Sequence, residues 1–155
     1  MKTSSLYVHF PFCRHKCNYC DFYSIIELSN EPAFFDALFR EIEIQAESSY
    51  FSNRTFSTLY VGGGTPSLIS TKYLDPLITR LRKSFNFSND AEFSFEANPG
   101  VILTNRLDAF KDVGFNRLTI GIQSFNDAEL AFLTRIHSAK EAVYAIQLAR
   151  DWGFN

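Results

Sequence analysis

The chain is organised around residues 6 to 22, Leu-Tyr-Val-His-Phe-Pro-Phe-Cys-Arg-His-Lys-Cys-Asn-Tyr-Cys-Asp-Phe. This stretch contains all three cysteines of the chain, Cys13, Cys17 and Cys20, in the spacing C-x3-C-x2-C. The apolar, β-prone run before them predicts a strand. The cysteines are therefore expected on a loop that leaves the end of that strand.

Three thiolates this close in sequence can bind one small inorganic group. A [4Fe–4S] cluster held by three cysteines leaves one iron open to a substrate or cofactor, whereas an electron-transfer cluster ordinarily takes four cysteines. Spacing alone leaves two alternatives open: a zinc site completed by His9 or His15, and buried thiols that act as small hydrophobic side chains. The residues between the cysteines are polar, which suits a loop better than a packed strand.

Length, charge and hydropathy narrow the class of protein. The chain has 155 residues, 46% of them hydrophobic, which is enough for one domain with a sizeable core. A formal charge of −2 gives no electrostatic case for a nucleic-acid partner. No apolar run is long enough for a transmembrane helix, and no signal peptide precedes the first strand. Unpaired thiols without an export signal predict a cytoplasmic protein.

Strand-like runs alternate with helical patterns along the chain. Strands are predicted at about residues 5–10, 58–61, 92–96 and 117–122, and helices at about 31–50, 70–85, 104–113, 127–133 and 139–152. Asn30 is the expected N-cap of the first helix, and Pro32 suits its first turn. Four βα units in series predict an α/β fold with a parallel sheet. An open doubly wound sheet and a barrel both fit this pattern.

Each predicted strand ends in an unusual motif. After the cysteine loop come Gly62-Gly63-Gly64-Thr65-Pro66, then Glu96 with Asn98-Pro99, and finally Gln123-Ser124. Functional groups gather at the carboxyl ends of parallel strands, so these motifs are expected on one rim. The glycines would let the backbone approach a ligand closely. They do not form a phosphate loop, because no Gly-Lys-Ser/Thr follows.

From the residues alone, each rim position also has an ordinary structural explanation. The glycines fit a plain turn, Glu96 a solvated charge, and Gln123 a polar strand end. Arg135 fits a solvated loop arginine, and Tyr7 fits packing on its strand.

The pattern Asp-x-Gly-Phe-Asn occurs twice, at residues 112–116 and 151–155. The first copy precedes a predicted strand, and Gly114 and Gly153 both read as glycines that end a helix. A further strand is therefore expected to begin at about residue 153. On this basis the chain is expected to be a fragment of a longer protein or the product of a truncated gene.

The cysteine motif C-x3-C-x-Φ-C, with Tyr19 as the aromatic Φ, resembles the signature of the radical S-adenosylmethionine (SAM) superfamily. The longer string Tyr-Val-His-Phe-Pro-Phe-Cys…Cys-x-Tyr-Cys-Asp-Phe resembles the branch that contains the oxygen-independent coproporphyrinogen III oxidases (HemN) and the HemW-type haem chaperones. The resemblance implies a partial (β/α)6 barrel. Residues 1–155 would be the N-terminal part of a radical SAM core domain, with about four βα units, and the C-terminal remainder would be absent.

The resemblance also implies roles for individual residues. Cys13, Cys17 and Cys20 would ligate the [4Fe–4S] cluster. The glycine segment would bind the amino group of SAM, and Arg135 would hold its carboxylate. Within this chain the implied SAM contacts are Tyr7, Tyr19, Gly63, Gly64, Thr65, Glu96, Gln123 and Arg135, and a further acidic SAM contact and most of the haem site would lie beyond residue 155.

Two functions are compatible with this branch. The implied chemistry is reductive cleavage of SAM to methionine and a 5′-deoxyadenosyl radical, in which the cofactor carries the difficult step. A haem chaperone would bind haem and deliver it to an acceptor protein, whereas an oxidase would decarboxylate two propionates in porphyrin biosynthesis. A Gly-Cys pair usually follows the third cysteine in the oxidase branch, but here Asp21-Phe22 follows. This difference favours the chaperone and argues against coproporphyrinogen dehydrogenase activity; the implied partners are haem or porphyrin, an electron donor and a haem acceptor.

Overall fold

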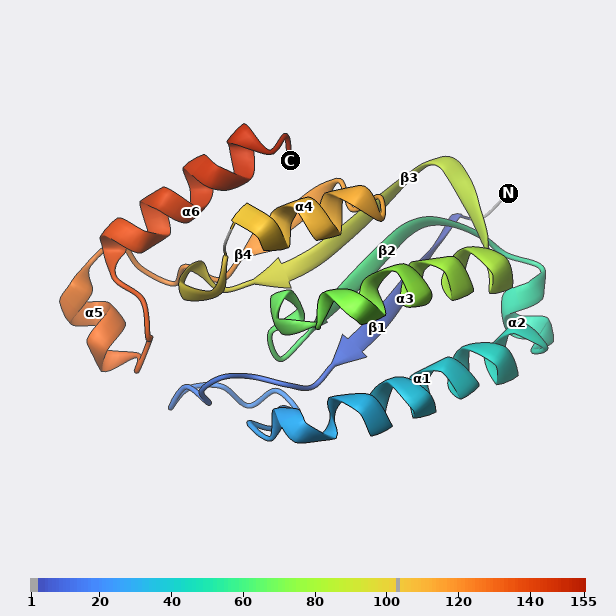
Figure 1. Ribbon diagram of the computed structural model, residues 1–155, viewed down its shortest axis with the longest axis horizontal. Helices are drawn as coiled ribbons and strands as arrows, with labels where there is room; N and C mark the ends of the chain where they lie inside the picture. Colours follow the sequence, from blue (N-terminus) through green and yellow to red (C-terminus); the bar gives the residue numbers. More distant parts are fainter. Residues whose placement is uncertain (1–2, 103) are drawn as a thin grey trace.

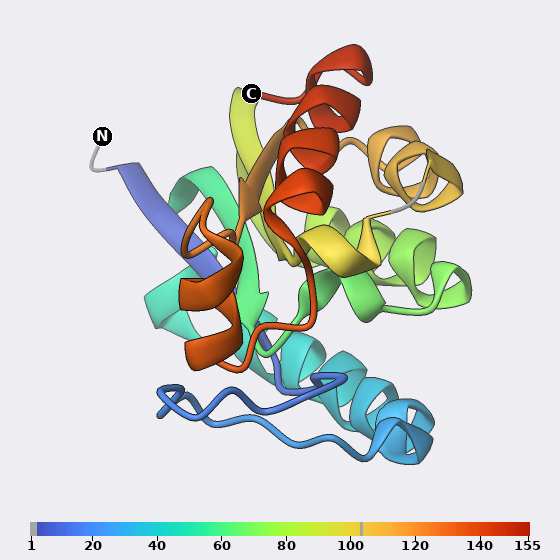
Figure 2. The same cartoon turned by 90° about the vertical axis from the view of Figure 1, so that its left-hand side faces the viewer.

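The computed structural model describes residues 3–102 and 104–155. A four-stranded sheet forms its centre, with strands β1 (Thr3–Phe10), β2 (Thr55–Gly63), β3 (Asn86–Ala97) and β4 (Arg117–Ile120). The strands lie in the order β1-β2-β3-β4, and each is parallel to the next. Right-handed crossovers between strands that follow in sequence order bring the helices that connect them to the same side of the sheet. Figures 1 and 2 show helices covering one face, and the predicted α/β fold with four βα units is confirmed.

The helices follow the strands in the predicted alternation. They are α1 (Glu31–Ala46), α2 (Ser49–Ser52), α3 (Thr71–Ser84), α4 (Thr104–Asp112), α5 (Asp127–Phe132) and α6 (Ala139–Asp151), with short 3-10 turns η1 (Leu28–Asn30), η2 (Pro66–Leu68) and η3 (Pro99–Val101). Within the described ranges, no helix is both long and apolar enough to cross a membrane.

The first helix differs from its prediction in two ways. The predicted helix over 31–50 is broken, because α1 ends at Ala46 and the Ser48 side chain accepts a hydrogen bond from Tyr50 N at 3.2 Å, which starts the separate helix α2. Serine side chains compete with the helix for backbone partners in this way. Asn30 occupies the N-cap position of α1, but its side chain makes no capping bond within the described chain. Its backbone is already helical (φ −82°, ψ −1°), because η1 runs directly into α1.

All four strands also differ in length from their predictions: β1 begins at Thr3 instead of residue 5, and β2 spans Thr55–Gly63 instead of residues 58–61. β3 begins at Asn86, six residues before the predicted start, and Asn86 and Phe87 pair with Thr55 and Phe56 before a register shift. The first half of β3 is mostly polar, so the sequence there lacks the apolar alternation that predicts a strand. β4 ends at Ile120 instead of residue 122.

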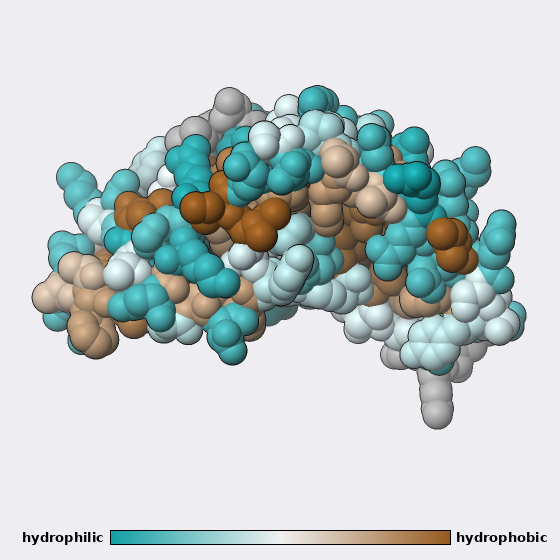
Figure 3. Space-filling model, turned by 90° about the horizontal axis from the view of Figure 1, so that it is seen from below, coloured by the Kyte–Doolittle hydropathy of each residue, from teal (hydrophilic) through white to brown (hydrophobic). Residues whose placement is uncertain are grey.

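The core lies between the sheet and the helices. Alternate strand residues point into it, and Phe95 of β3 stacks on Phe110 of α4 with ring centroids 3.9 Å apart. Eight phenylalanines are among its largest fully buried side chains: Phe10, Phe12, Phe35, Phe56, Phe93, Phe95, Phe110 and Phe115. The intervening residues, such as Tyr60 and Glu96, face the other side of the sheet. Figure 3 shows the arched outline of the molecule, with a hollow along one side.

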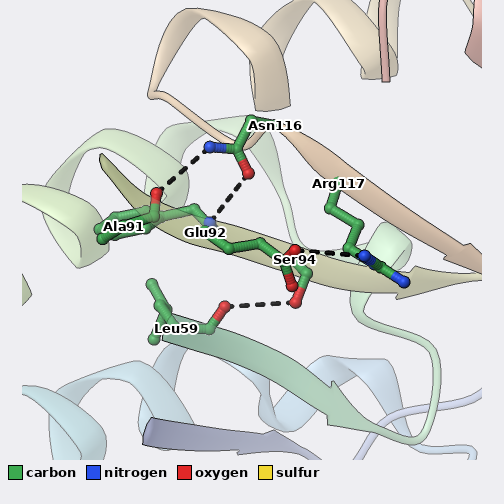
Figure 4. Close-up of polar contacts among 7 residues, drawn as sticks. Leu59, Ala91, Glu92, Ser94, Asn116 and Arg117 are labelled. Carbon is green, nitrogen blue, oxygen red and sulfur yellow. Dashed lines mark hydrogen bonds and ion pairs between the residues drawn. The ribbon is translucent and has the colours of Figure 1, made fainter. Parts of the chain in front are cut away.

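The repeated Asp-x-Gly-Phe-Asn pattern has a repeated geometry. Gly114 and Gly153 have φ of +100° and +69°, the left-handed conformation that ends a helix at glycine. At the end of the first copy, the Asn116 side chain accepts a hydrogen bond from Phe93 N at 3.0 Å and donates one to Ala91 O at 3.2 Å (Figure 4). At the end of the second copy, Asn155 N donates to Asn116 O at 3.2 Å and Asn155 O accepts from Leu118 N at 3.1 Å. Residue 155 therefore has the backbone pairing expected next to β4.

Candidate functional site

A pocket of about 400 Å³ lies at the carboxyl ends of the strands, a volume typical of small-molecule sites. Ten of the eleven residues predicted for the site line it: Cys13, Cys17, Tyr19, Cys20, Gly63, Gly64, Thr65, Glu96, Gln123 and Arg135. The remaining one, Tyr7, lies outside this lining. The pocket thus brings together residues that the chain separates by more than a hundred positions.

The cysteine loop is fixed at several points. At its base, Cys13 N donates to Ile25 O and Ile25 N donates to Pro11 O, both at 2.8 Å. At its tip, Asn18 N donates to Thr134 Oγ1 and Asn18 Nδ2 donates to Phe132 O, both at 3.0 Å. The connection between α5 and α6 therefore holds the loop against the sheet.

The three thiols suit a group larger than one metal ion. Cys13 is buried, Cys17 and Cys20 are half-buried, and none forms a disulfide within the described chain. No three His, Cys, Asp or Glu side chains in residues 3–102 and 104–155 are arranged to hold a single ion. In a [4Fe–4S] cluster each cysteine binds a different iron, so three thiols that line one pocket fit that group.

His9 is already engaged by protein groups. Its Nε2 lies 2.9 Å from Tyr23 O, and because a carbonyl only accepts, Nε2 carries the proton. Its Nδ1 therefore accepts from the Tyr7 hydroxyl, also at 2.9 Å. Zinc binds one ring nitrogen, so a zinc site completed by His9 would have to replace one of these two contacts.

The glycine segment packs against the protein's own backbone. Gly64 N donates to Phe10 O at 2.7 Å and Thr65 N donates to Phe12 O at 2.8 Å. A Cβ on Gly64 would lie 2.5 Å from Phe12 O, and Gly63 has φ +115°. The N–H groups of Gly63, Gly64 and Thr65 are therefore not free for a ligand, since Gly63 N also donates, to Glu96 Oε2 at 3.1 Å. An ammonium group needs acceptors, and here those would be carbonyl oxygens and the Glu96 carboxylate.

Glu96 is held by two donors on β2. Besides Gly63 N, the Tyr60 hydroxyl donates to Glu96 Oε1 at 2.5 Å. Burial first, and then the hydrogen bond to Glu96 and its charge, raise the pKa of Tyr60 to about 12. Tyr7 stacks on Tyr60 with ring centroids 6.1 Å apart, and partial burial followed by the Glu96 charge raises the pKa of Tyr7. Tyr7 thus reaches the site through Tyr60 and not by lining the pocket.

Arg135 joins the cysteine loop to two strand ends. Its terminal nitrogens donate to Asn98 Oδ1 and Gly121 O at 2.6 Å, and to Tyr19 Oη and Cys17 Sγ at 3.4 and 3.5 Å. Partial burial raises the pKa of Tyr19, and the positive charge of Arg135 acts in the opposite direction. Arg135 Nε is buried and has no hydrogen-bond partner among the described residues. Buried polar groups are almost always bonded in native structures, so an anionic ligand at this point would satisfy the guanidinium.

Two residues beside the pocket have left-handed backbone conformations. Gln123 has φ +74° and Thr134 has φ +54°, values that are uncommon for non-glycine residues and strained for a β-branched one. Such strain gathers at functional sites where the surroundings impose it. Thr134 receives the hydrogen bond from the cysteine loop, and Gln123 turns the chain away from β4 with its side chain exposed beside the pocket.

Sequence reasoning missed several residues of this region. Tyr60 supports Glu96, while Asn98, Thr119 and Gly121 line the pocket. Asn98 stands in one of the rim motifs, but the sequence indicated no role for it. Gly121 could have been found from the sequence, because a glycine inside a strand pattern marks a place where another group comes close to the backbone. A Cβ there would lie 2.9 Å from Asn98 Oδ1.

Three comparisons with known proteins agree with this geometry. The haem chaperone HemW of Haemophilus influenzae is 38% identical over 154 residues, which cover 96% of this chain and 40% of that protein. The oxygen-independent coproporphyrinogen III oxidase of Salmonella typhimurium is 39% identical over 153 residues, which cover 97% of this chain and 33% of that protein. The solved structure of coproporphyrinogen III oxidase (HemN) from Escherichia coli, described as a radical SAM enzyme, superposes with a TM-score of 0.87 at 35% identity, and covers 97% of this chain and 35% of that one.

The chain thus spans well under half the length of the curated relatives that it matches. The family model described as "Radical SAM superfamily" matches residues 7–155. This range includes the cysteine loop, all four strand ends and Arg135. The chain belongs to the radical SAM superfamily.

Proposed function

We propose that this chain forms the cofactor site of a radical SAM protein of the coproporphyrinogen III oxidase-like branch, and that its function is to bind and transfer haem. Membership of the superfamily implies SAM and a [4Fe–4S] cluster. The observation that carries the proposal is that one pocket collects the three cysteines and seven residues expected to contact SAM. Cys13, Cys17 and Cys20 would hold the cluster.

The residues around the pocket have complementary tasks. When bound, the cluster and SAM supply one-electron reductive chemistry at the sulfonium of SAM. Glu96, fixed by Tyr60 and Gly63, would accept hydrogen bonds from the ammonium group. Arg135 would hold the carboxylate through its unpartnered Nε–H. The protein thus binds and orients the cofactor.

The choice of haem transfer rests on the residues after the third cysteine. Asp21-Phe22 stands where the oxidase branch is expected to have Gly-Cys. The oxidase remains the second candidate because of the high structural similarity to HemN. Haem or porphyrin, an electron donor and a haem-acceptor protein are the proposed partners, and the unpaired thiols suit the reducing cytoplasm as the proposed location.

The first test is the metal content of the chain after anaerobic reconstitution with iron and sulfide. We expect about four irons per chain and an EPR spectrum of the reduced cluster that shifts when SAM is added. Cys17→Ala should lose the cluster. Zinc in place of iron, or a cluster whose spectrum ignores SAM, would contradict the cofactor assignment.

The second test separates the two functions. The reconstituted chain is titrated anaerobically with haem and followed by its visible absorption, and in parallel it is incubated with coproporphyrinogen III, SAM and a reductant. Haem binding without turnover supports the chaperone, and turnover supports the oxidase. The absence of both haem binding and turnover would overturn the haem assignment and leave the cofactor assignment standing.

A further inference from the structure

Asn98, one residue beyond β3, connects two parts of the pocket that come from different elements. Its Oδ1 lies 2.6 Å from a terminal nitrogen of Arg135, and its Nδ2 lies 3.1 Å from Thr65 Oγ1. Thr65 is only 2% exposed, and its hydroxyl lies 3.5 Å from Cys13 Sγ. Three consecutive hydrogen bonds therefore run from Arg135 to the first cysteine.

The chemistry of the groups fixes the direction of every bond in this series. A guanidinium only donates, so the amide oxygen of Asn98 must face Arg135. The amide nitrogen then faces Thr65 and donates to its hydroxyl oxygen. The single hydroxyl proton of Thr65 is left to point at Cys13 Sγ. A side chain at residue 98 must therefore accept from Arg135 and donate to Thr65, which requires both an acceptor and a donor.

Gly121, the first residue after β4, packs against the Asn98 amide. Gly121 N donates to Ala97 O at 2.8 Å, and Gly121 O accepts from the same guanidinium nitrogen as Asn98 does, at 2.6 Å. A Cβ on Gly121 would lie 2.9 Å from Asn98 Oδ1, too close for an alanine without a shift of the amide. The absence of a side chain at residue 121 thus makes room for the oxygen that faces Arg135.

We propose that Asn98 is a positioning residue that keeps the Thr65 hydroxyl donating to Cys13 Sγ and thereby raises the reduction potential of the cluster. This inference rests on the proposed function, because it requires the cluster on Cys13. Hydrogen bonds to the cysteine sulfurs are among the factors that set the potential of an iron–sulfur cluster. A donor at the sulfur favours the more negatively charged, reduced state.

The informative substitution is Asn98→Asp, which keeps the shape and removes the donor. A carboxylate only accepts, so the Thr65 hydroxyl would turn to the introduced carboxylate and leave the sulfur without its donor. We expect the midpoint potential of the cluster to fall, measured by anaerobic potentiometric titration followed by EPR. The added negative charge would also lower the potential, so the single variant does not distinguish the two causes.

A double-mutant cycle makes that distinction. Thr65→Val removes the hydroxyl at nearly constant shape, and Thr65→Ser retains it as the conservative control. If Asn98 acts through Thr65, Asn98→Asp lowers the potential more in the wild-type and Thr65→Ser backgrounds than in the Thr65→Val background. A shift of equal size in all backgrounds would mean that only charge acts, and would overturn the inference.

A second variant covers the case in which Asn98→Asp does not assemble a cluster. Gly121→Ala should displace the amide without a change of charge and lower the potential, again only when residue 65 keeps its hydroxyl. An unchanged potential in Gly121→Ala would contradict the inference. A wild-type chain that assembles no cluster would instead contradict the proposed function.

Discussion

His137 shows how one buried side chain can make the stability of the protein depend on pH. It is only 4% exposed, and its Nε2 donates to Ile122 O at 3.1 Å. Its Nδ1 is buried without a partner in the described part of the chain. Burial first, and then the nearby positive charge of Arg135, lower the pKa of His137. The folded protein therefore keeps this histidine neutral.

This pKa difference predicts that acidification destabilises the fold. In the unfolded chain a histidine titrates near pH 6.5, so below that pH the unfolded state binds more protons than the folded state. The free energy of unfolding should fall as the pH decreases through this window. His137→Gln keeps a donor for Ile122 O and removes the titration, so urea unfolding between about pH 5 and 8 should show a smaller pH dependence than the wild type.

The control for this prediction is His15→Gln, at an exposed histidine. Measuring both variants side by side compares the removal of a buried histidine with the removal of an exposed one. If His137→Gln also had the wild-type slope, protonation of His137 would not be what couples stability to pH.

At the scale of a single element, the start of α6 determines where the connection that carries Arg135, residues 133–138, ends. Ser138 and Glu141 form a reciprocal cap: Glu141 N donates to Ser138 Oγ at 3.2 Å, and Ser138 N donates to Glu141 Oε2 at 2.7 Å. The hydrogen bonds that Ser138 N and Ser138 Oγ donate to the Glu141 carboxylate hold the pKa of Glu141 below its usual range. Ala139 N also donates to Asp127 Oδ1 of α5, at 2.7 Å. The cap thus fixes the α6 end of the short connection that carries Arg135, and the Asp127 contact ties that end to the start of α5.

Loss of this cap should be measurable as a loss of stability. Ser138→Ala removes the side-chain half of the capping box, and N-cap substitutions of this kind cost about 1 kcal/mol. Urea unfolding should show this decrease, whereas Ser49→Ala, at an exposed serine in α2, should change the stability little. A Ser138→Ala protein as stable as the wild type would mean that tertiary contacts alone hold the start of α6.

At the scale of the whole molecule, the proposed cofactors bridge segments that are distant in sequence. The pocket is lined by the loop after β1, by the ends of β2 and β3, and by residues on both sides of α5. A ligand that binds only the folded arrangement stabilises it through mass action. Assembly of the cluster and binding of SAM should therefore raise the thermal stability of the entire chain.

Anaerobic melting experiments test this coupling. The reconstituted chain should melt above the metal-free chain, and SAM at about 100 times its Kd should add roughly 2.7 kcal/mol of stability. In Arg135→Gln, the cluster should still raise the melting temperature by much of the wild-type amount. SAM should raise it by much less than in the wild type. An equal response of this variant and the wild type to SAM would exclude Arg135 as a holder of the cofactor.

The sequence by itself determined the elements and their inner and outer faces. The βα alternation predicted the parallel sheet, and Gly114 and Gly153 marked the helix ends correctly. In a strand, successive residues such as Phe95 and Glu96 face opposite sides, so the sequence separates the buried ring from the carboxylate. These features depend on local periodicity and local backbone preference, which short stretches of sequence encode. The cysteine spacing likewise lies within one loop.

Only the tertiary structure decided which partners those faces meet. It placed Tyr60 and Gly63 against Glu96, Asn98 between Arg135 and Thr65, and Tyr7 outside the pocket lining. It also used the N–H groups of the glycine segment to hold the cysteine loop. These contacts depend on the register of neighbouring strands and on how closely their ends approach, and side-chain periodicity leaves both unspecified until the core packs.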